Sequence, residues 1–122
     1  MLGFVSLGTN DLKAAGGGFY DTVFNVLGAK RSQEGERISM WSSKSGTGSI
    51  AVITPFDKNP ATAGNGTILS LDARDSQNVK AVHAKAIEMG GTDEGAPGPR
   101  GTGDFYSGYF RDLDGNKLVA FC

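Results

Sequence analysis

Apolar and polar positions alternate at the start of the chain and then take up a helical spacing. Residues 3–8 alternate in this way, which predicts a strand. Asn10 or Asp11 can cap a helix that ends at Gly28, a stop signal. Its apolar face would consist of Leu12, Ala15, Phe19, Val23, Val26 and Leu27. Because each glycine of Gly16–Gly18 costs about 1 kcal/mol relative to alanine in a helix, we expect weak first turns.

Three short strands are predicted after this helix. The first covers Ala29–Gln33 and turns at Glu34-Gly35 into the second, Glu36–Ser42. A Gly/Ser loop then leads to the third, Ser49–Thr54. A long loop with two prolines, Pro55–Gly66, closes this half of the chain.

The same order of elements then begins again. A strand at Thr67–Ala73 precedes a helix over 76–89, which Asp75 or Ser76 caps and Gly90-Gly91 ends. A Gly/Pro loop through Gly103 follows, with room for a short strand near Thr92–Glu94. The last two strands are predicted as a hairpin across Asp112–Asn116, namely Phe105–Arg111 and Lys117–Cys122.

The element order is therefore β-α-β-β-β, repeated once after about 65 residues. Few folds have this order, so the sequence predicts an α+β fold. Its first module covers about residues 1–56 and its second about 66–122. No linker divides them, which predicts a single domain over residues 1–122.

Composition and charge narrow the range of partners. The 122 residues are 39% hydrophobic and 20% charged, as expected for one globular domain. The net charge is −1 with no run of Lys or Arg, so we expect no nucleic-acid partner. No apolar run has the length of a membrane span, and Met1–Leu7 is too short for a signal peptide. The single cysteine, Cys122, cannot form an internal disulfide, which favours a cytoplasmic location.

Four segments in the right order resemble the vicinal-oxygen-chelate superfamily, which has the glyoxalase/bleomycin-resistance/extradiol-dioxygenase fold. They are Val5–Leu12, Phe19-Tyr20 with Val26–Gly28, Gly90–Thr92 with Gly95–Arg100, and Tyr109–Leu118, which looks like the family's "F-x-D-P-D-G-N" hairpin. The resemblance covers essentially the whole chain. It implies two β-α-β-β-β modules whose curved mixed sheets form a cleft, and it implies a homodimer, with or without exchange of strands.

The resemblance also points to positions where family members hold a divalent metal ion. These ligands come from the first strand and the late strands of each half. The corresponding positions here are Phe4, Ile68 and Val119, with a fourth near Thr54. Phenylalanine, isoleucine and valine cannot coordinate a metal ion. We therefore expect no bound metal and no other cofactor.

A few side chains are candidates for contacts with a ligand. Arg100 follows a Gly/Pro-rich stretch and could clamp a carboxylate or phosphate. Trp41 and Tyr109 lie on predicted strands, where they would line a pocket or fill the core. Ser6 and Ser70 share strand parity with the residues at two of the lost metal positions and should face the same cleft. The only histidine, His83, fits a structural role on the second helix.

Three functions remain open. The first is a metal-independent protein that binds a small hydrophobic or anionic molecule through Ser6, Trp41, Ser70, Arg100 and Tyr109. The second is a glyoxalase-like lyase or isomerase, similar to lactoylglutathione lyase, with displaced metal ligands and unknown catalytic residues. It would need the spare carboxylates to converge, namely Glu34, Glu36, Asp72, Glu88 and Glu94. The third is a structural domain whose cleft is filled by Phe4, Ile68 and Val119.

Overall fold

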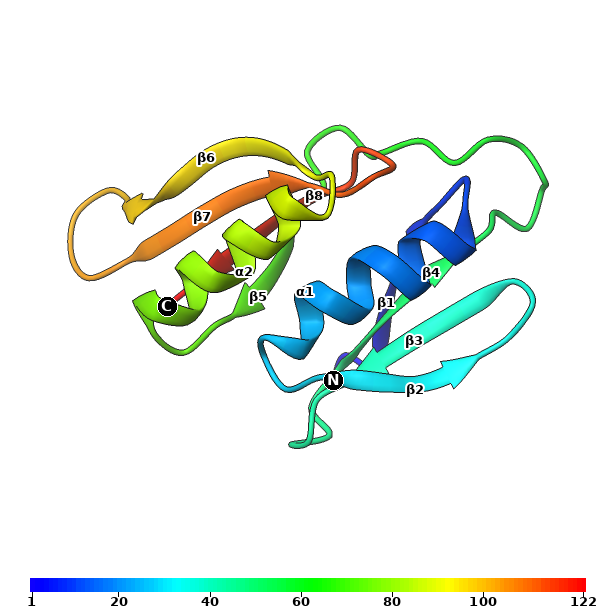
Figure 1. Ribbon diagram of the computed structural model, residues 1–122, viewed down its shortest axis with the longest axis horizontal. Coiled ribbons are helices and arrows are strands. Elements are labelled where there is room, and N and C mark those ends of the chain that lie inside the picture. Colours follow the sequence, from blue (N-terminus) through cyan, green and yellow to red (C-terminus); the bar gives the residue numbers. More distant parts are fainter.

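The structure, a computed structural model that describes residues 1–122, contains two four-stranded sheets with the helices between them (Figure 1). The first sheet has the order β1-β4-β3-β2, with β1 Phe4–Gly8, β2 Lys30–Glu34, β3 Ile38–Ser42 and β4 Ser49–Ile53. The second has the order β5-β8-β7-β6, with β5 Leu69–Asp72, β6 Thr92–Pro99, β7 Tyr106–Arg111 and β8 Lys117–Phe121. In each sheet one parallel pair, β1–β4 or β5–β8, joins two antiparallel pairs. The predicted α+β class and the repeated element order are confirmed.

The first helix of the chain is irregular and the second is regular. A π-helical segment η1, Ala14–Tyr20, contains the glycine run and continues into α1, Asp21–Asn25. In the π segment a backbone N–H bonds to a carbonyl five residues back, as the Asp21 N–H does to Gly16 O. The second helix, α2, covers Ser76–Glu88, and the Asp75 side chain caps it by accepting a 2.8 Å bond from the Asn78 N–H. Neither helix is long and apolar enough to cross a membrane.

The stretch after α2 differs from the prediction. Residues 92–99 form one eight-residue strand, β6, so a Gly/Pro loop through Gly103 is wrong and only the segment 100–105 connects β6 to β7. β6 lies at the edge of its sheet, where a proline without an N–H donor is tolerated. Its pairing with β7 shifts register twice, between Asp93 and Gly95 and between Gly95 and Gly98. These bulges accommodate the glycines that suggested a loop.

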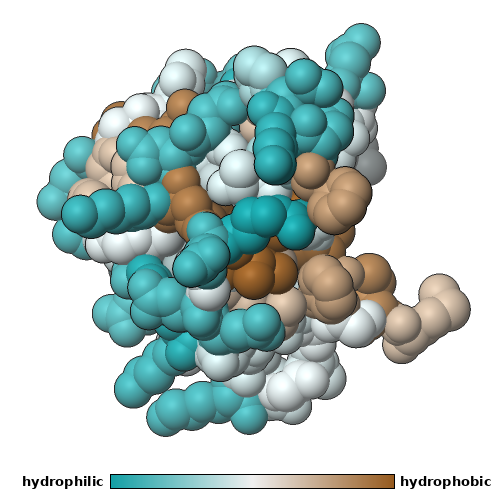
Figure 2. Space-filling view, turned by 90° about the vertical axis from the view of Figure 1, so that its right-hand side faces the viewer, coloured by the Kyte–Doolittle hydropathy of each residue, from teal (hydrophilic) through white to brown (hydrophobic).

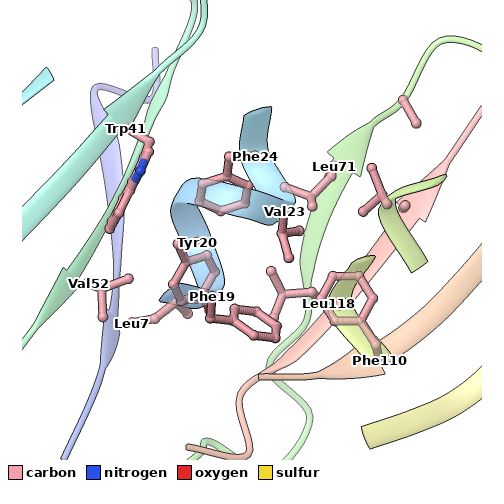
Figure 3. Close-up of a cluster of buried hydrophobic side chains, with 14 of the residues drawn as sticks. Leu7, Phe19, Tyr20, Val23, Phe24, Trp41, Val52, Leu71, Phe110 and Leu118 are labelled. Atoms are coloured by element: carbon pink, nitrogen blue, oxygen red, sulfur yellow. The ribbon is translucent and has the colours of Figure 1, made fainter. Parts of the chain in front are cut away.

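The hydrophobic core lies on both sides of the first helix (Figure 3). Side chains of the first sheet pack on one side of this helix and side chains of the second sheet on the other. The labelled members are Leu7, Trp41 and Val52 from the first sheet, Phe19, Tyr20, Val23 and Phe24 from the helix, and Leu71, Phe110 and Leu118 from the second sheet. Full burial of one such side chain contributes about 1.5–3 kcal/mol. Tertiary packing therefore holds a helix whose glycines disfavour it.

The β7–β8 turn ties the second module to the first. The Asp112 carboxylate accepts hydrogen bonds from the Tyr20 hydroxyl at 2.6 Å and from Asn116 Nδ2 at 2.8 Å. Asn116 Nδ2 also donates to the carbonyl of Gly8, at the end of β1. Burial and the nearby Asp112 carboxylate raise the pKa of Tyr20 well above its usual value, so the phenol remains a donor.

Candidate functional site

A hollow of about 780 Å³ lies between the first strands of the two sheets, and we call it the inter-sheet pocket. Phe4 and Ile50 line it from the first sheet, and residues 68–73 line it from β5 and the chain next to it. The turn that follows α1 contributes Val26 and Leu27. Hydrophobic residues are 13 of the 22 that line it, and its volume lies within the range of about 300–1,000 Å³ that is typical of small-molecule sites. The pocket is therefore suited to a small apolar ligand.

Polar groups and exposed apolar side chains surround the pocket. The polar residues that line it are Ser43, Ser45, Thr47, Ser49, Ser70, Asp72, Arg74 and Asn78. Leu2 and Phe4, which also line it, are 75% and 54% exposed. Figure 2 views the molecule from the side of the first sheet, where hydrophobic side chains gather in the middle of the face with hydrophilic ones around them. Exposed apolar side chains next to a hollow, such as Leu2 and Phe4, mark a ligand site or an interface.

Trp41 forms a rigid part of the pocket wall. Its ring is 2% exposed and belongs to the core as well as to the pocket lining. The indole Nε1 donates to Asp21 Oδ1 at 2.7 Å, and Asp21 Oδ2 accepts from Arg31 Nη2 at 2.7 Å. The Arg31 guanidinium lies 5.4 Å from the centre of the indole ring. Because Asp21 and Arg31 fix the ring, the pocket wall is formed before any ligand enters.

The three lost metal positions do not fill this space. Phe4 and Ile68 line the inter-sheet pocket and are 54% and 45% exposed. Val119 is buried on β8 and does not line the pocket. Ser70, its partner in register on β5, lines the pocket, whereas Ser6 does not. The pocket is therefore open, with one of the two predicted serines in its wall.

The carboxylates that a displaced metal site would need lie apart. No group of three or more His, Cys, Asp or Glu side chains is placed to hold a metal ion. Glu34 pairs with Arg31, Glu88 with Lys85, and Glu94 with Arg111. The ring of His83 is buried on α2, where its Nε2 lies 3.0 Å from Asp93 Oδ1. Hydrogen bonds from the Gly95 N–H and from His83 lower the pKa of Asp93.

Arg100 and Tyr109 lie together, away from the inter-sheet pocket, on the second sheet. The Arg100 guanidinium carbon is 5.9 Å from the centre of the Tyr109 ring, and Lys117 Nζ is 5.5 Å from it. We call these three residues the Tyr109 cluster. The sequence analysis did not select Lys117, because a lysine that opens a strand after a turn carries no signal of its own. The five predicted ligand contacts are thus divided: Trp41 and Ser70 share the pocket, Arg100 and Tyr109 share the cluster, and Ser6 joins neither.

Comparison with known proteins gives consistent results. The sequence profile of the Glyoxalase/Bleomycin resistance protein/Dioxygenase superfamily matches residues 2–120. The crystal structure of a glyoxalase/bleomycin resistance protein from Albidiferax ferrireducens T118 is 35% identical over 99% of this chain and 97% of that one, with a TM-score of 0.90. A glyoxalase/bleomycin resistance protein/dioxygenase family enzyme from Burkholderia phytofirmans PsJN is 20% identical over 98% and 95% of the two chains, with a TM-score of 0.77. No curated protein matches the chain significantly.

Proposed function

Because the chain belongs to the glyoxalase/bleomycin resistance protein/dioxygenase superfamily, we propose that it binds a small, largely apolar molecule in the inter-sheet pocket without using a metal ion. The open volume of about 780 Å³ with its mainly hydrophobic lining carries this proposal. The buried Trp41 would form part of the wall behind the ligand, and Ser70 would offer a hydroxyl at the edge. Phe4 and Ile68 would add apolar contact.

The two other functions receive less support. A lyase with displaced metal ligands needs converging carboxylates, and Glu34, Glu88 and Glu94 each pair with a different cation. A domain with a filled cleft needs Phe4, Ile68 and Val119 packed together, but only the first two line the pocket, and both are about half exposed. The exposed apolar side chains at the pocket rim also support our proposal of a homodimer, which we expect to act in the cytoplasm.

Native mass spectrometry of the gently purified protein tests metal, ligand and assembly together. We expect a dimer without a divalent ion, and a co-purified small organic mass would begin to identify the ligand. One divalent ion per chain would contradict the metal-independent proposal. In that case a lactoylglutathione lyase assay, with and without added Zn²⁺ or Ni²⁺, would test the enzyme alternative.

The only tryptophan of the chain gives a direct readout of the pocket itself. Trp41 fluorescence should fall saturably, with one site per chain, when the neutral apolar probe N-phenyl-1-naphthylamine is added. Phe4→Ser should weaken this binding by about tenfold, since it removes a large part of the apolar contact.

Phe56→Ser is the matched control for this titration. Phe56 is 84% exposed and does not line the pocket, so the same substitution there should leave the affinity unchanged. A linear, non-saturating response, or equal losses in the two variants, would count against a site in the inter-sheet pocket.

A further inference from the structure

One asparagine of the chain is followed by a glycine, in the loop that joins the two modules. This is Asn65, which precedes Gly66 between β4 and β5 (Figure 1). The amide carbon of an asparagine side chain can be attacked by the main-chain nitrogen of the next residue, because the two close a five-membered ring. The side chain of the next residue normally shields that nitrogen, and glycine has none. Asn65 is therefore the only asparagine of the six whose neighbouring nitrogen is unshielded.

The turn around Asn65 leaves both reacting groups free. The N–H of Thr67 donates to the carbonyl of Gly64 at 3.2 Å, so Asn65 and Gly66 are the two central residues of the turn. Gly66 has a φ of 90°, which glycine adopts without strain. Both central residues are exposed, and neither the Asn65 side chain nor the Gly66 N–H forms a hydrogen bond in the structure. Water therefore reaches the amide, and the nitrogen can lose its proton without giving up a bond.

The other asparagines are fixed by hydrogen bonds or followed by an unreactive neighbour. Asn116 is buried, and its Nδ2 donates to the carbonyl of Gly8 at 2.9 Å and to Asp112 Oδ2 at 2.8 Å. Both ends of the Asn10 amide bond to the main chain of Ala61, through Nδ2 at 3.1 Å and Oδ1 at 2.7 Å. A following proline has no N–H, and a following valine is branched at Cβ and shields its nitrogen. These neighbours occur after Asn59, Asn25 and Asn78.

A second turn with a similar sequence provides a comparison within the chain. Asp114 and Gly115 lie between β7 and β8, and Gly115 also has a positive φ, of 87°. Here the Gly115 N–H donates to the carbonyl of Asp112 at 3.2 Å, and the Asp114 carboxylate accepts the N–H of Asn10 at 2.8 Å. A carboxylate also resists attack by a nucleophile more than an amide does, because it carries a negative charge. The nitrogen and the side chain are therefore engaged in this turn and free in the turn of Asn65.

We propose that Asn65 is a site of spontaneous covalent modification, in which its side-chain amide is converted to a carboxylate. The Gly66 nitrogen loses its proton to a base in solution and attacks Cγ of Asn65. A bond forms between this nitrogen and Cγ, the Cγ–Nδ2 bond breaks, and Nδ2 takes up a proton from water and leaves as ammonia. Water then opens the succinimide ring. Cleavage at Cγ gives aspartate, and cleavage at the main-chain carbonyl carbon gives isoaspartate, so water is the only co-reactant.

The modification changes both the charge and the main chain of the segment that joins the modules. Asn65 lines a second hollow, of about 410 Å³, together with Arg111 and Lys117, so the new carboxylate arises on the same surface as two cations. Isoaspartate also lengthens the main chain by one carbon atom. Ile68, three residues further along, lines the inter-sheet pocket, so the modified residue lies close in sequence to that site.

Peptide mapping of the aged protein by mass spectrometry tests the proposal. The folded protein is incubated at 37 °C at pH 7 and pH 8 and then digested with trypsin, which cleaves after Lys58 and Arg74 and releases the peptide 59–74. We expect the amide-to-acid mass increase at Asn65, with aspartate and isoaspartate as two separable products. The initial rate should be about tenfold higher at pH 8, since the nitrogen reacts only after losing its proton. No conversion at Asn65, or equal conversion at Asn59 in the same peptide, overturns the proposal.

Two variants identify the reacting groups. Asn65→Gln keeps the amide but requires a six-membered ring, so conversion at this position should fall by about tenfold or more. Gly66→Ala places a methyl group beside the nitrogen and should also slow conversion by about tenfold. Asn59→Gln, in the same loop and the same peptide, is the matched control and should leave the rate at Asn65 unchanged. An unchanged rate in Gly66→Ala, with aspartate as the only product, would mean that water attacks the amide directly and would contradict the ring.

Comparison with an unfolded reference measures what the structure contributes. The synthetic peptide 59–74 has no fold to protect it, so its rate gives the reactivity of the sequence alone. Because both reacting groups are exposed and free of hydrogen bonds in the folded protein, we expect the two rates to agree within about tenfold. A protein that stays intact while the peptide converts would mean that the turn protects Asn65, and the proposal would then be wrong.

Discussion

The two modules have the same strand order, but their helices are stabilised in different ways. The helix of the second module, α2, has a side-chain cap, no glycine and 13 regular residues. The helix of the first module contains three glycines, is π-helical over Ala14–Tyr20, and continues into an α-helical segment, α1, of only five residues. Yet the first helix holds three of the five largest buried aromatic side chains, namely Phe19, Tyr20 and Phe24, the other two being Trp41 and Phe110.

The difference follows from the position of each helix. The first helix packs between the two sheets, so residues on two of its sides are buried (Figure 3). Much of its stability therefore comes from contacts distant in sequence, which can override poor local propensity. α2 covers its own sheet, and its cap and its composition contribute a larger share of its stability. Mutations that remove tertiary contacts of the first helix should therefore cost more than mutations of local helix signals in either module.

The largest effect is expected at Asp112, which joins the two modules. Asp112→Ala removes the acceptor of the Tyr20 hydroxyl and of Asn116 Nδ2, and leaves both donors buried. Each hydrogen bond to a charged group contributes about 1.5–3 kcal/mol, so we expect the free energy of unfolding to fall by about 3 kcal/mol or more. Urea denaturation followed by circular dichroism measures this loss.

Asp114→Ala is the control in the same turn. The Asp114 carboxylate accepts one hydrogen bond across the modules, from the Asn10 N–H at 2.8 Å, and it is less buried. Its loss should cost about 1 kcal/mol. Equal losses at the two positions would mean that the turn as a whole, and not the buried Tyr20–Asp112 bond, joins the modules.

Much of the fold could be predicted from the sequence because its signals are local. The cap at Asp75 and the apolar spacing of the second helix predicted α2 to within one residue at its end. The hairpin across Asp112–Asn116 was equally clear, because Gly115 adopts the positive φ of 87° that its turn requires. β6 was missed because its glycines and prolines are tolerated only at a bulged sheet edge, and edge position is not visible in the sequence.

The site was less predictable because its residues meet only in the folded chain. Strand parity grouped Ser70 with Ile68, but parity cannot say that the inter-sheet pocket includes Ser70 and excludes Ser6. The sequence did not indicate that the Asp21 carboxylate accepts a hydrogen bond from Trp41, because an acidic side chain on a helix usually faces solvent. Nor could the sequence show that Lys117 comes within 5.5 Å of the centre of the Tyr109 ring, because the two residues lie on different strands.

Exchanging alanine and glycine between the helices tests the contrast in local propensity. Ala84→Gly in α2 should lower the free energy of unfolding by about 1 kcal/mol, and Gly17→Ala in the first helix should raise it by about 0.5–1 kcal/mol. A Cβ on Gly17 meets nothing within 4 Å, so the gain is not offset by a clash. Thermal and urea unfolding measure both variants. Gly91→Ala is the control and should destabilise, because its Cβ would lie 2.7 Å from two carbonyl oxygens.

The smallest effect is expected on acidification and concerns β6 of the second module. Hydrogen bonds from the Gly95 N–H and His83 lower the pKa of Asp93, and the hydrogen bond from Arg111 lowers that of Glu94. Because the folded-state pKa values lie below the ordinary values of 3.8 and 4.5, both groups stabilise the fold above these values. That stability is lost as the pH falls further, through the folded-state values. Both groups are exposed, so the effect should be modest.

Amide hydrogen exchange of β6, compared between pH 6 and pH 3, would reveal this loss, with β2 at the same place in the first sheet as the internal reference. Asp93→Asn combined with Glu94→Gln should weaken protection of β6 at pH 6 and remove most of its further decline at pH 3, because neither new side chain can be protonated in that range. A decline of the same size in the double variant would assign acid sensitivity to other carboxylates. The edge strand β6 would then contribute nothing to the pH dependence of stability in the second module. The two modules would in that case differ only in their helices.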